Sequence, residues 1–202
     1  MNFRTLFLSL LLIVFASCKQ STDQLFDEAY QLTKDKQYEQ ALTIYDKLIR
    51  QNNKLQLAYY NRGYCYSELK RYDKALADFN KVLSLQQHGD VIITFNKDMP
   101  YTDEEVRTHV PYNDALYQRA QVKYHMDSLR SAFVEFKVLI DNNYTEKSNC
   151  LIWQGNIWIR DGKDDKACES YQKAKAIAVT EEDRMDADGY IKEYCLQVNN
   201  NL

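Results

Sequence analysis

The chain contains the stretch Gln37-Tyr38-Glu39-Gln40-Ala41-Leu42, and a close variant, Arg71-Tyr72-Asp73-Lys74-Ala75-Leu76, follows it farther along the chain. In both stretches a tyrosine, an acidic residue, an alanine and a leucine keep the same places. The offset from Ala41 to Ala75 gives a period of about 34 residues, which is typical of repeat proteins whose units bury their apolar faces only by stacking on their neighbours. The two stretches therefore predict an array of similar units, the first beginning at Thr22 and the second at Gln56.

Further residues recur when each unit is counted from its first residue. Positions 8 and 20 hold small residues, position 24 holds an aromatic residue, and positions 4, 11, 17 and 27 hold larger apolar or aromatic ones. At positions 4, 8, 11, 17, 20, 24 and 27, the first unit has Leu25, Ala29, Leu32, Tyr38, Ala41, Tyr45 and Leu48. At the same positions the second unit has Tyr59, Gly63, Tyr66, Tyr72, Ala75, Phe79 and Val82. This pattern resembles the tetratricopeptide repeat, a pair of antiparallel helices. Small residues at positions 8 and 20 let the two helices approach, and larger residues fill the space around the contact.

Two later units fit the same pattern less closely. At positions 4, 8, 20, 24 and 27 the third unit has Leu116, Ala120, Ala132, Phe136 and Leu139, and the fourth has Leu151, Gly155, Ala167, Tyr171 and Ala174. Lys123 departs from the pattern at position 11 of the third unit, and Asp164 departs from it at position 17 of the fourth. Only five glycines and two prolines occur in the chain, which favours helices over a sheet-rich fold. The expected fold is all-α, a right-handed superhelix of about four tetratricopeptide-type helix pairs.

An insertion is expected between the second and third units. Ala132 is the alanine of the third unit that corresponds to Ala75. The separation between the two exceeds one repeat period by about two thirds of a period. The insertion, 86–111, contains both prolines and an apolar stretch, Val91-Ile92-Ile93-Thr94-Phe95, that favours either a short strand or an extended segment packed on the helices. Either a partner-binding element or a structural filler would explain it. Repeats one and two then span 24–85, and repeats three and four span 112–180.

The segment after the fourth unit, 181–198, predicts a capping helix. Tyr190, Ile191 and Tyr194 follow the spacing of one helical face, and Val198 continues it. A repeat array needs such a cap because the outer face of its last unit is otherwise exposed.

The segment 1–17 has the order of a secretory signal peptide, with Arg4, an apolar run from Leu6 to Phe15 and small residues before Cys18. That run is too short for a spanning helix, which needs ~20 residues. Ala16-Ser17-Cys18 resembles the lipobox of bacterial lipoproteins. The resemblance implies a covalent lipid on Cys18, a tether over 18–23 and no other cofactor. Because Lys19 follows the cysteine, it also implies a Gram-negative outer-membrane lipoprotein. The periplasmic face is favoured over the cell surface, and both stay open. An ordinary signal peptide with a chance cysteine is the alternative.

Four other cysteines remain, and none has metal-ligand spacing. Cys65 and Cys168 fall inside apolar helical patterns, where a free thiol behaves as a small apolar group. A disulfide between Cys168 and Cys195 is an open alternative, because an exported protein can oxidise its thiols.

The resemblance also implies a binding surface on the first helix of each unit, at positions 2, 5, 9, 12 and 13. The predicted groove residues are Phe26, Tyr30, Tyr60, Tyr64, Tyr117, Gln121, Tyr124, His125 and Asn156. Aromatic side chains are enriched at binding hot spots, which favours a peptide or helix of a protein partner as the ligand. Packing of several of these rings between units is the alternative. Phe26 and Tyr30 stand where the family's carboxylate clamp needs lysine and asparagine, so that mode of binding is disfavoured.

Other classes of function find little support in the sequence. The net charge of −3 gives no electrostatic case for nucleic acid. No HExxH, GxSxG, phosphate-binding loop or dinucleotide motif occurs, and the three histidines are scattered, so neither an enzyme nor a metal site is expected. The leading hypothesis is a membrane-anchored interaction scaffold of the bacterial envelope. The alternative is a lipoprotein that binds a small ligand or glycan through its aromatic groove.

Overall fold

A computed structural model describes residues 20–86 and 109–195, which form nine α-helices and one short π-helix. The helices are α2 (Thr22–Lys34), α3 (Tyr38–Gln51), α4 (Gln56–Glu68), α5 (Tyr72–Gln86), α7 (Tyr112–His125), α8 (Leu129–Asp141), α9 (Lys147–Arg160), α10 (Asp164–Ile177), α11 (Glu181–Tyr190) and η1 (Ile191–Cys195). These two ranges contain no strand. The predicted signal peptide, Cys18 and the apolar stretch Val91–Phe95 lie outside the described residues.

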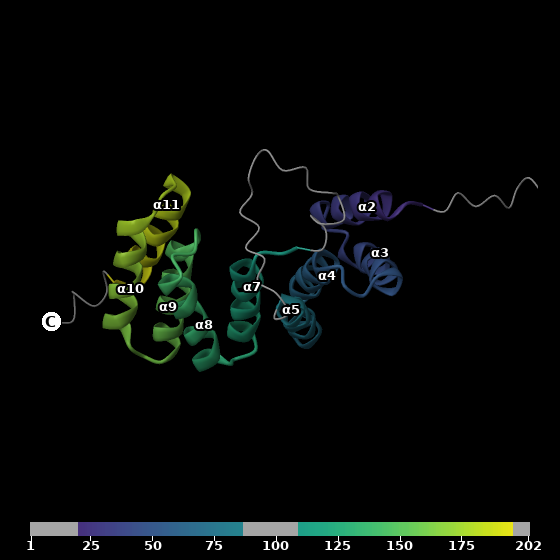
Figure 1. Ribbon diagram of the computed structural model, residues 1–202. Helices are drawn as coiled ribbons and strands as arrows, with labels where there is room; N and C mark the ends of the chain where they lie inside the picture. Colours follow the sequence, from purple (N-terminus) through teal and green to yellow (C-terminus); the bar gives the residue numbers. More distant parts are fainter. Residues whose placement is uncertain (1–19, 87–108, 196–202) are drawn as a thin grey trace, which may run out of the picture.

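The helices form four antiparallel pairs that follow one another along a curved array (Figure 1). The pairs are α2 with α3, α4 with α5, α7 with α8, and α9 with α10, so the expected all-α fold is confirmed. Helix α7 packs on α5 as α4 packs on α3 and α9 on α8. Helix α11 packs on α10 at the C-terminal end of the array. Within the described residues, no helix has the length and apolar character that crossing a membrane requires.

The residues predicted to bring the helices of a pair together are buried. The alanines at position 20, Ala41, Ala75, Ala132 and Ala167, are 0% exposed, and so are the aromatic residues at position 24, Tyr45, Phe79, Phe136 and Tyr171. Their burial is local, because each cluster of core side chains joins one helix pair to the next. The core is therefore a series of clusters along the array, as expected for a repeat protein.

An ion-pair arrangement, here called the arginine joint, links the first two units. Arg62 on α4 donates to Asp78 on α5 with both Nε (2.8 Å) and Nη2 (2.7 Å), and its Nη1 donates to Asp46 on α3 (2.7 Å). Asp78 is only 4% exposed, so its charge depends on this partner. Arg62, at position 7 of the second unit, thus links the second helix of its own unit, α5, to the second helix of the preceding unit, α3.

The third unit repeats the joint with different side chains. Arg119, again at position 7, donates to Glu135 of its own unit (2.5 Å) and to Asn80 of the preceding one (2.9 Å). Lys123 donates to the same Glu135 (2.7 Å). The departure at position 11 is thereby explained, because the lysine shares a buried carboxylate instead of filling an apolar site.

The turn inside each unit has one conformation in all four pairs. Position 15 is left-handed throughout, with φ of 59° at Lys36, 56° at Lys70, 62° at Asp127 and 67° at Gly162. The next residue donates its N–H to the carbonyl five residues earlier, for example Arg71 to Tyr66 at 2.8 Å. This is the arrangement of a glycine-terminated helix end. Only the fourth unit uses glycine there, as its sequence predicted.

A disulfide joins Cys168 on α10 to Cys195 at the end of η1, with 5.5 Å between the Cα atoms. The prediction of a free core thiol was therefore wrong for Cys168, and the alternative holds. Cys65 is free and 0% exposed, as predicted, and Cys150 is equally buried. The bridge fastens the residues after α11 onto the last helix pair.

Candidate functional site

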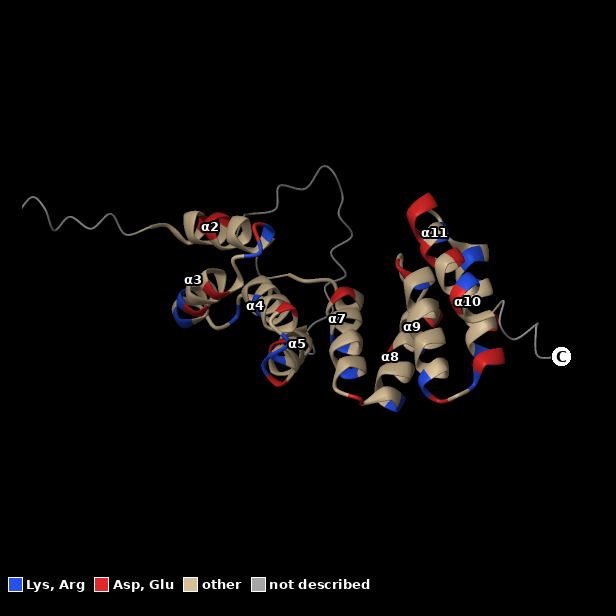
Figure 2. Ribbon diagram, turned by 180° about the vertical axis from the view of Figure 1, so that it is seen from behind, with Lys and Arg blue, Asp and Glu red and all other residues tan. Residues whose placement is uncertain are grey.

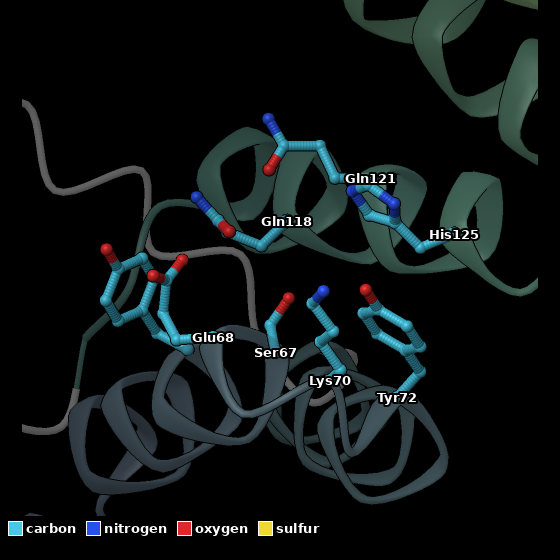
Figure 3. A pocket seen from close by; sticks show the side chains of 8 residues that line it. Ser67, Glu68, Lys70, Tyr72, Gln118, Gln121 and His125 are labelled. Atoms are coloured by element: carbon cyan, nitrogen blue, oxygen red, sulfur yellow. The ribbon is translucent and has the colours of Figure 1, made fainter.

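A polar pocket of about 320 Å³ lies at the seam between the second and third units (Figure 3). Its lining residues come from α4, the turn after it, the start of α5, and α7. They are Tyr64, Ser67, Glu68, Lys70, Tyr72, Gln118, Gln121 and His125. We call this cavity the seam pocket. Three of the predicted groove residues, Tyr64, Gln121 and His125, thus meet in one place.

One wall of the seam pocket carries hydrogen-bond donors. Figure 3 shows Ser67, Lys70 and Tyr72 pointing toward α7. Among the described residues, neither hydroxyl group makes a hydrogen bond, and the Lys70 ammonium has neither a hydrogen bond nor an ion pair. These donors are therefore available to a ligand.

The carboxylate of the pocket is already engaged. Glu68 accepts a hydrogen bond from the Tyr38 hydroxyl of the preceding unit at 3.1 Å. Burial, and next the hydrogen bond to Glu68, raise the pKa of Tyr38 to about 12, which keeps this hydroxyl a donor. Glu68 therefore links α4 of the second unit to α3 of the first, and it keeps its negative charge because Tyr38 is neutral.

His125 lies among aromatic rings at the other end of the pocket. Its ring stacks on Tyr72 with 5.3 Å between centroids and meets Tyr124 and Trp153 edge-on. Desolvation by these neighbours, followed by the positive charges of Arg160 and Lys70, lowers the pKa of His125 below its usual value. The neutral imidazole is thus favoured at pH 7.

Several predicted groove aromatics pack between helices. Tyr60 contacts Phe79 edge-on at 5.8 Å, and Tyr117 contacts Phe136 in the same way at 6.1 Å. Burial raises the pKa of both tyrosine hydroxyls to about 12. Phe26 is 4% exposed within the core of the first unit, so we do not retain it as a groove residue. These rings follow the packing alternative left open by the sequence.

The remaining groove residues lie on either side of the seam pocket. Tyr30 is 55% exposed, with the Lys34 ammonium 5.8 Å from its ring centroid. Tyr124 carries the Arg160 guanidinium over its ring at 5.1 Å. Asn156 accepts a hydrogen bond from the Tyr171 hydroxyl at 2.8 Å. Partner contact by any of these residues stays a prediction.

The sequence analysis missed Lys70, Tyr72 and Gln118. Lys70 is at position 15 and Tyr72 at position 17, both outside the expected groove positions. No sequence signal set Lys70 apart, because Lys36 and Asp127 stand at the same left-handed position of their units. Among the described residues, no three His, Cys, Asp or Glu side chains gather as a metal site would need.

Charges of both signs are interspersed over the array (Figure 2). The most acidic helix is α11, whose first turn holds Glu181, Glu182 and Asp183. Acidic side chains there interact favourably with the N-terminal end of the helix dipole. Within the described residues, Lys and Arg are thus not gathered apart from Asp and Glu along the ribbon of Figure 2.

Residues 57–88 match the family model of the tetratricopeptide repeat. The match covers the second unit, the one that contains Arg62, Lys70 and Tyr72. Sperm-associated antigen 1 of Rattus norvegicus is 36% identical over 59 residues, which is 29% of this chain and 7% of that protein. This chain therefore spans far less than the length of that relative, and the likeness concerns the repeat.

Solved structures of repeat proteins resemble the whole array. MamA from Desulfovibrio magneticus RS-1 is 14% identical, with a TM-score of 0.59 over 89% of this chain and 96% of that chain. A kinesin light chain from Podosopora anserina with nearly identical tetratricopeptide-like repeats is 10% identical, with a TM-score of 0.63 over 89% of this chain and 86% of that chain. At such identities the likeness establishes the fold alone. The fold is that of proteins built from tetratricopeptide repeats.

Proposed function

We propose that this protein is a membrane-anchored interaction scaffold of the bacterial envelope, and not an enzyme. The first helices of the repeat units would together bind a peptide or helix of a partner protein. The observation that carries the proposal is the seam pocket, where Tyr64 of the second unit and Gln121 and His125 of the third converge. Tetratricopeptide arrays characteristically serve as protein-binding surfaces, since stacked units present one continuous concave face.

The proposal of an exported, lipid-anchored chain rests on two features. The first is Cys18, which follows Ala16-Ser17 in a lipobox-like order and would carry the lipid. The second is the disulfide between Cys168 and Cys195, because structural disulfides persist in oxidising compartments such as the periplasm. Together they support an exported lipoprotein, and we propose that it lies in the outer membrane and faces the periplasm.

Crosslinking from native membranes, followed by capture and identification of the bound proteins, tests the groove. The variants are Tyr30→Ala and Tyr64→Ala, and the control is Val134→Ala. Tyr30 and Val134 are both 55% exposed, but Val134 lies on α8, a second helix. Tyr60→Ala is unsuitable, because it would remove packing against Phe79.

We expect wild type and Val134→Ala to capture the same partner, and the two tyrosine variants to lose it. Equal capture by all four proteins would contradict the groove. Retention of a glycan without any captured protein would favour the small-ligand alternative instead.

The anchor has a separate test. Cys18→Ser should abolish incorporation of labelled palmitate and move the protein from the membrane to the soluble fraction. Unchanged membrane association would contradict lipid anchoring through this thiol.

A further inference from the structure

The seam pocket gathers donors that lack acceptors. Ser67 contributes a hydroxyl, Lys70 an ammonium and Tyr72 a phenol, and none of these groups has a partner among the described residues. They occupy positions 12, 15 and 17 of the second unit and point to the same side (Figure 3). A set of convergent donors with one cation is complementary to an anion.

The pocket lining carries one cation and one carboxylate. Glu68 accepts a hydrogen bond from the neutral Tyr38 hydroxyl and keeps its negative charge. Arg160, which lies near His125, is paired with Asp127 at 2.6 Å. Lys70 has no ion pair within the described part of the chain, so a bound anion would pair with it.

We propose that the seam pocket binds the carboxylate of an aspartate or glutamate side chain from the partner segment, with Ser67, Lys70 and Tyr72 as donors. This inference rests on the proposed function. A single lysine suits a monoanion better than a dianionic phosphate, which is usually held by arginine clusters. The pocket lies among the groove positions of two units, so a segment bound along the groove passes over it.

The test uses an array of capped twelve-residue peptides, acetylated and amidated so that side chains carry the only carboxylates. Each acidic peptide is paired with a version in which Glu or Asp is replaced by Gln or Asn. The full-length chain in detergent is compared with Lys70→Met and with Lys36→Met. Lys36 is a matched control, because it is an exposed lysine with a φ of 59° at the same turn of the first unit.

We expect wild type and Lys36→Met to bind the acidic version of a subset of peptides about tenfold more tightly than the amide version, the size expected of a charge-assisted hydrogen bond. Lys70→Met should bind both versions equally. Its melting temperature should match that of wild type, because methionine keeps the stem of the side chain and the conformation of the turn.

Three results would overturn the inference. If wild type binds peptides without preferring the acidic versions, the pocket is not a carboxylate site, although the scaffold proposal stands. If the preference survives in Lys70→Met, or is lost equally in Lys36→Met, it arises elsewhere on the surface. If wild type binds no peptide at all, the peptide groove fails and this inference fails with it.

Discussion

At Gly155 the two helices of the fourth unit are so close that a methyl group has no room. A β-carbon there would lie 2.3 Å from Cε1 of Tyr171, whose ring is fully buried. At Gly63, the same position of the second unit, the nearest atom would be Cε1 of Phe79 at 3.0 Å. Gly189 on α11 has nothing within 4 Å. The effect of replacing glycine by alanine on stability can therefore be compared at three positions that leave different amounts of room for the added methyl group.

We expect Gly155→Ala to lower the free energy of unfolding by about 2–3 kcal/mol, because the Tyr171 ring must shift within a packed core. Gly189→Ala should raise it by about 0.5–1 kcal/mol, since alanine favours helix over glycine. Gly63→Ala should fall between them. Urea denaturation measures all three, and an effect of Gly155→Ala no larger than that of Gly63→Ala would contradict the close approach.

His125 should titrate below its usual pKa of 6.5. Since its folded pKa is lowered, the unfolded chain takes up the proton more readily. The stability that His125 contributes is therefore present above about pH 6.5 and is lost as the pH falls toward the lowered value. An NMR titration of the imidazole gives the pKa, which Lys70→Met should raise by removing one nearby cation. Lys36→Met should leave the pKa unchanged.

Residue types and spacing were enough to predict which side chains fill the core, but not which aromatic rings stay accessible. The rings of Tyr60 and Tyr117 occupy the same repeat position and both pack between helices. A tyrosine suits a groove and a helix seam equally well, because its ring is apolar and its hydroxyl is polar. The contacts that decide between the two come from another helix, which spacing within one helix cannot reveal.

At the scale of the helices, the arginine joint fixes how one unit sits on the next. Arg62 touches α3 and α5 as well as lying on α4, so three helices share one guanidinium. Its five donors in a planar fork allow this, where a lysine would provide a point charge. The joint was not predicted, although its members recur at positions 7, 23 and 25 of the units, because spacing shows that polar residues recur and not that they meet across two units.

Arg62→Met should lower the free energy of unfolding by about 3 kcal/mol, because it leaves the buried Asp78 without a partner. Asp46→Asn should cost less than about 1 kcal/mol, since that carboxylate is 39% exposed. Thermal and urea unfolding measure both changes. The double variant Arg62→Met/Asp78→Leu should recover much of the loss, and failure to recover would contradict the assigned cause.

The grouping of the helices into repeat units followed from the repeat period, and the inserted segment between α5 and α7 followed from the interruption of that period. The turn at Gly162 could also be predicted, because glycine is the usual residue at a left-handed helix end. The equivalent turns at Lys36, Lys70 and Asp127 could not, because their residues do not favour that conformation. Packing of the unit imposes it on them.

At the scale of the whole molecule, stability is a sum over neighbouring units. The last unit has a neighbour on one side only, and α11 with η1 covers the other side. The disulfide between Cys168 and Cys195 holds this cover in place across 27 residues of sequence.

Replacing both cysteines by serine should lower the free energy of unfolding of the cap by about 3–4 kcal/mol, the value that chain entropy gives for a loop of this size. The loss should be local. Hydrogen exchange should speed up in α11 and in α10, while α2 to α5 keep their protection. Equally faster exchange along the entire chain would contradict a local role for the bridge.

Helix α7 packs on α5 as neighbouring units pack elsewhere in the array, although the segment 87–111 stands between them in the chain. The contact is made by side chains such as Val82, Leu83 and Ala115, and by the hydrogen bond from Arg119 to Asn80. The register of the two halves is thus held by a surface rather than by the covalent chain. If the chain is cleaved between α5 and α7, we expect the two fragments to associate and restore the array. For the same reason, we expect a reporter domain to be tolerated when it is inserted between these helices.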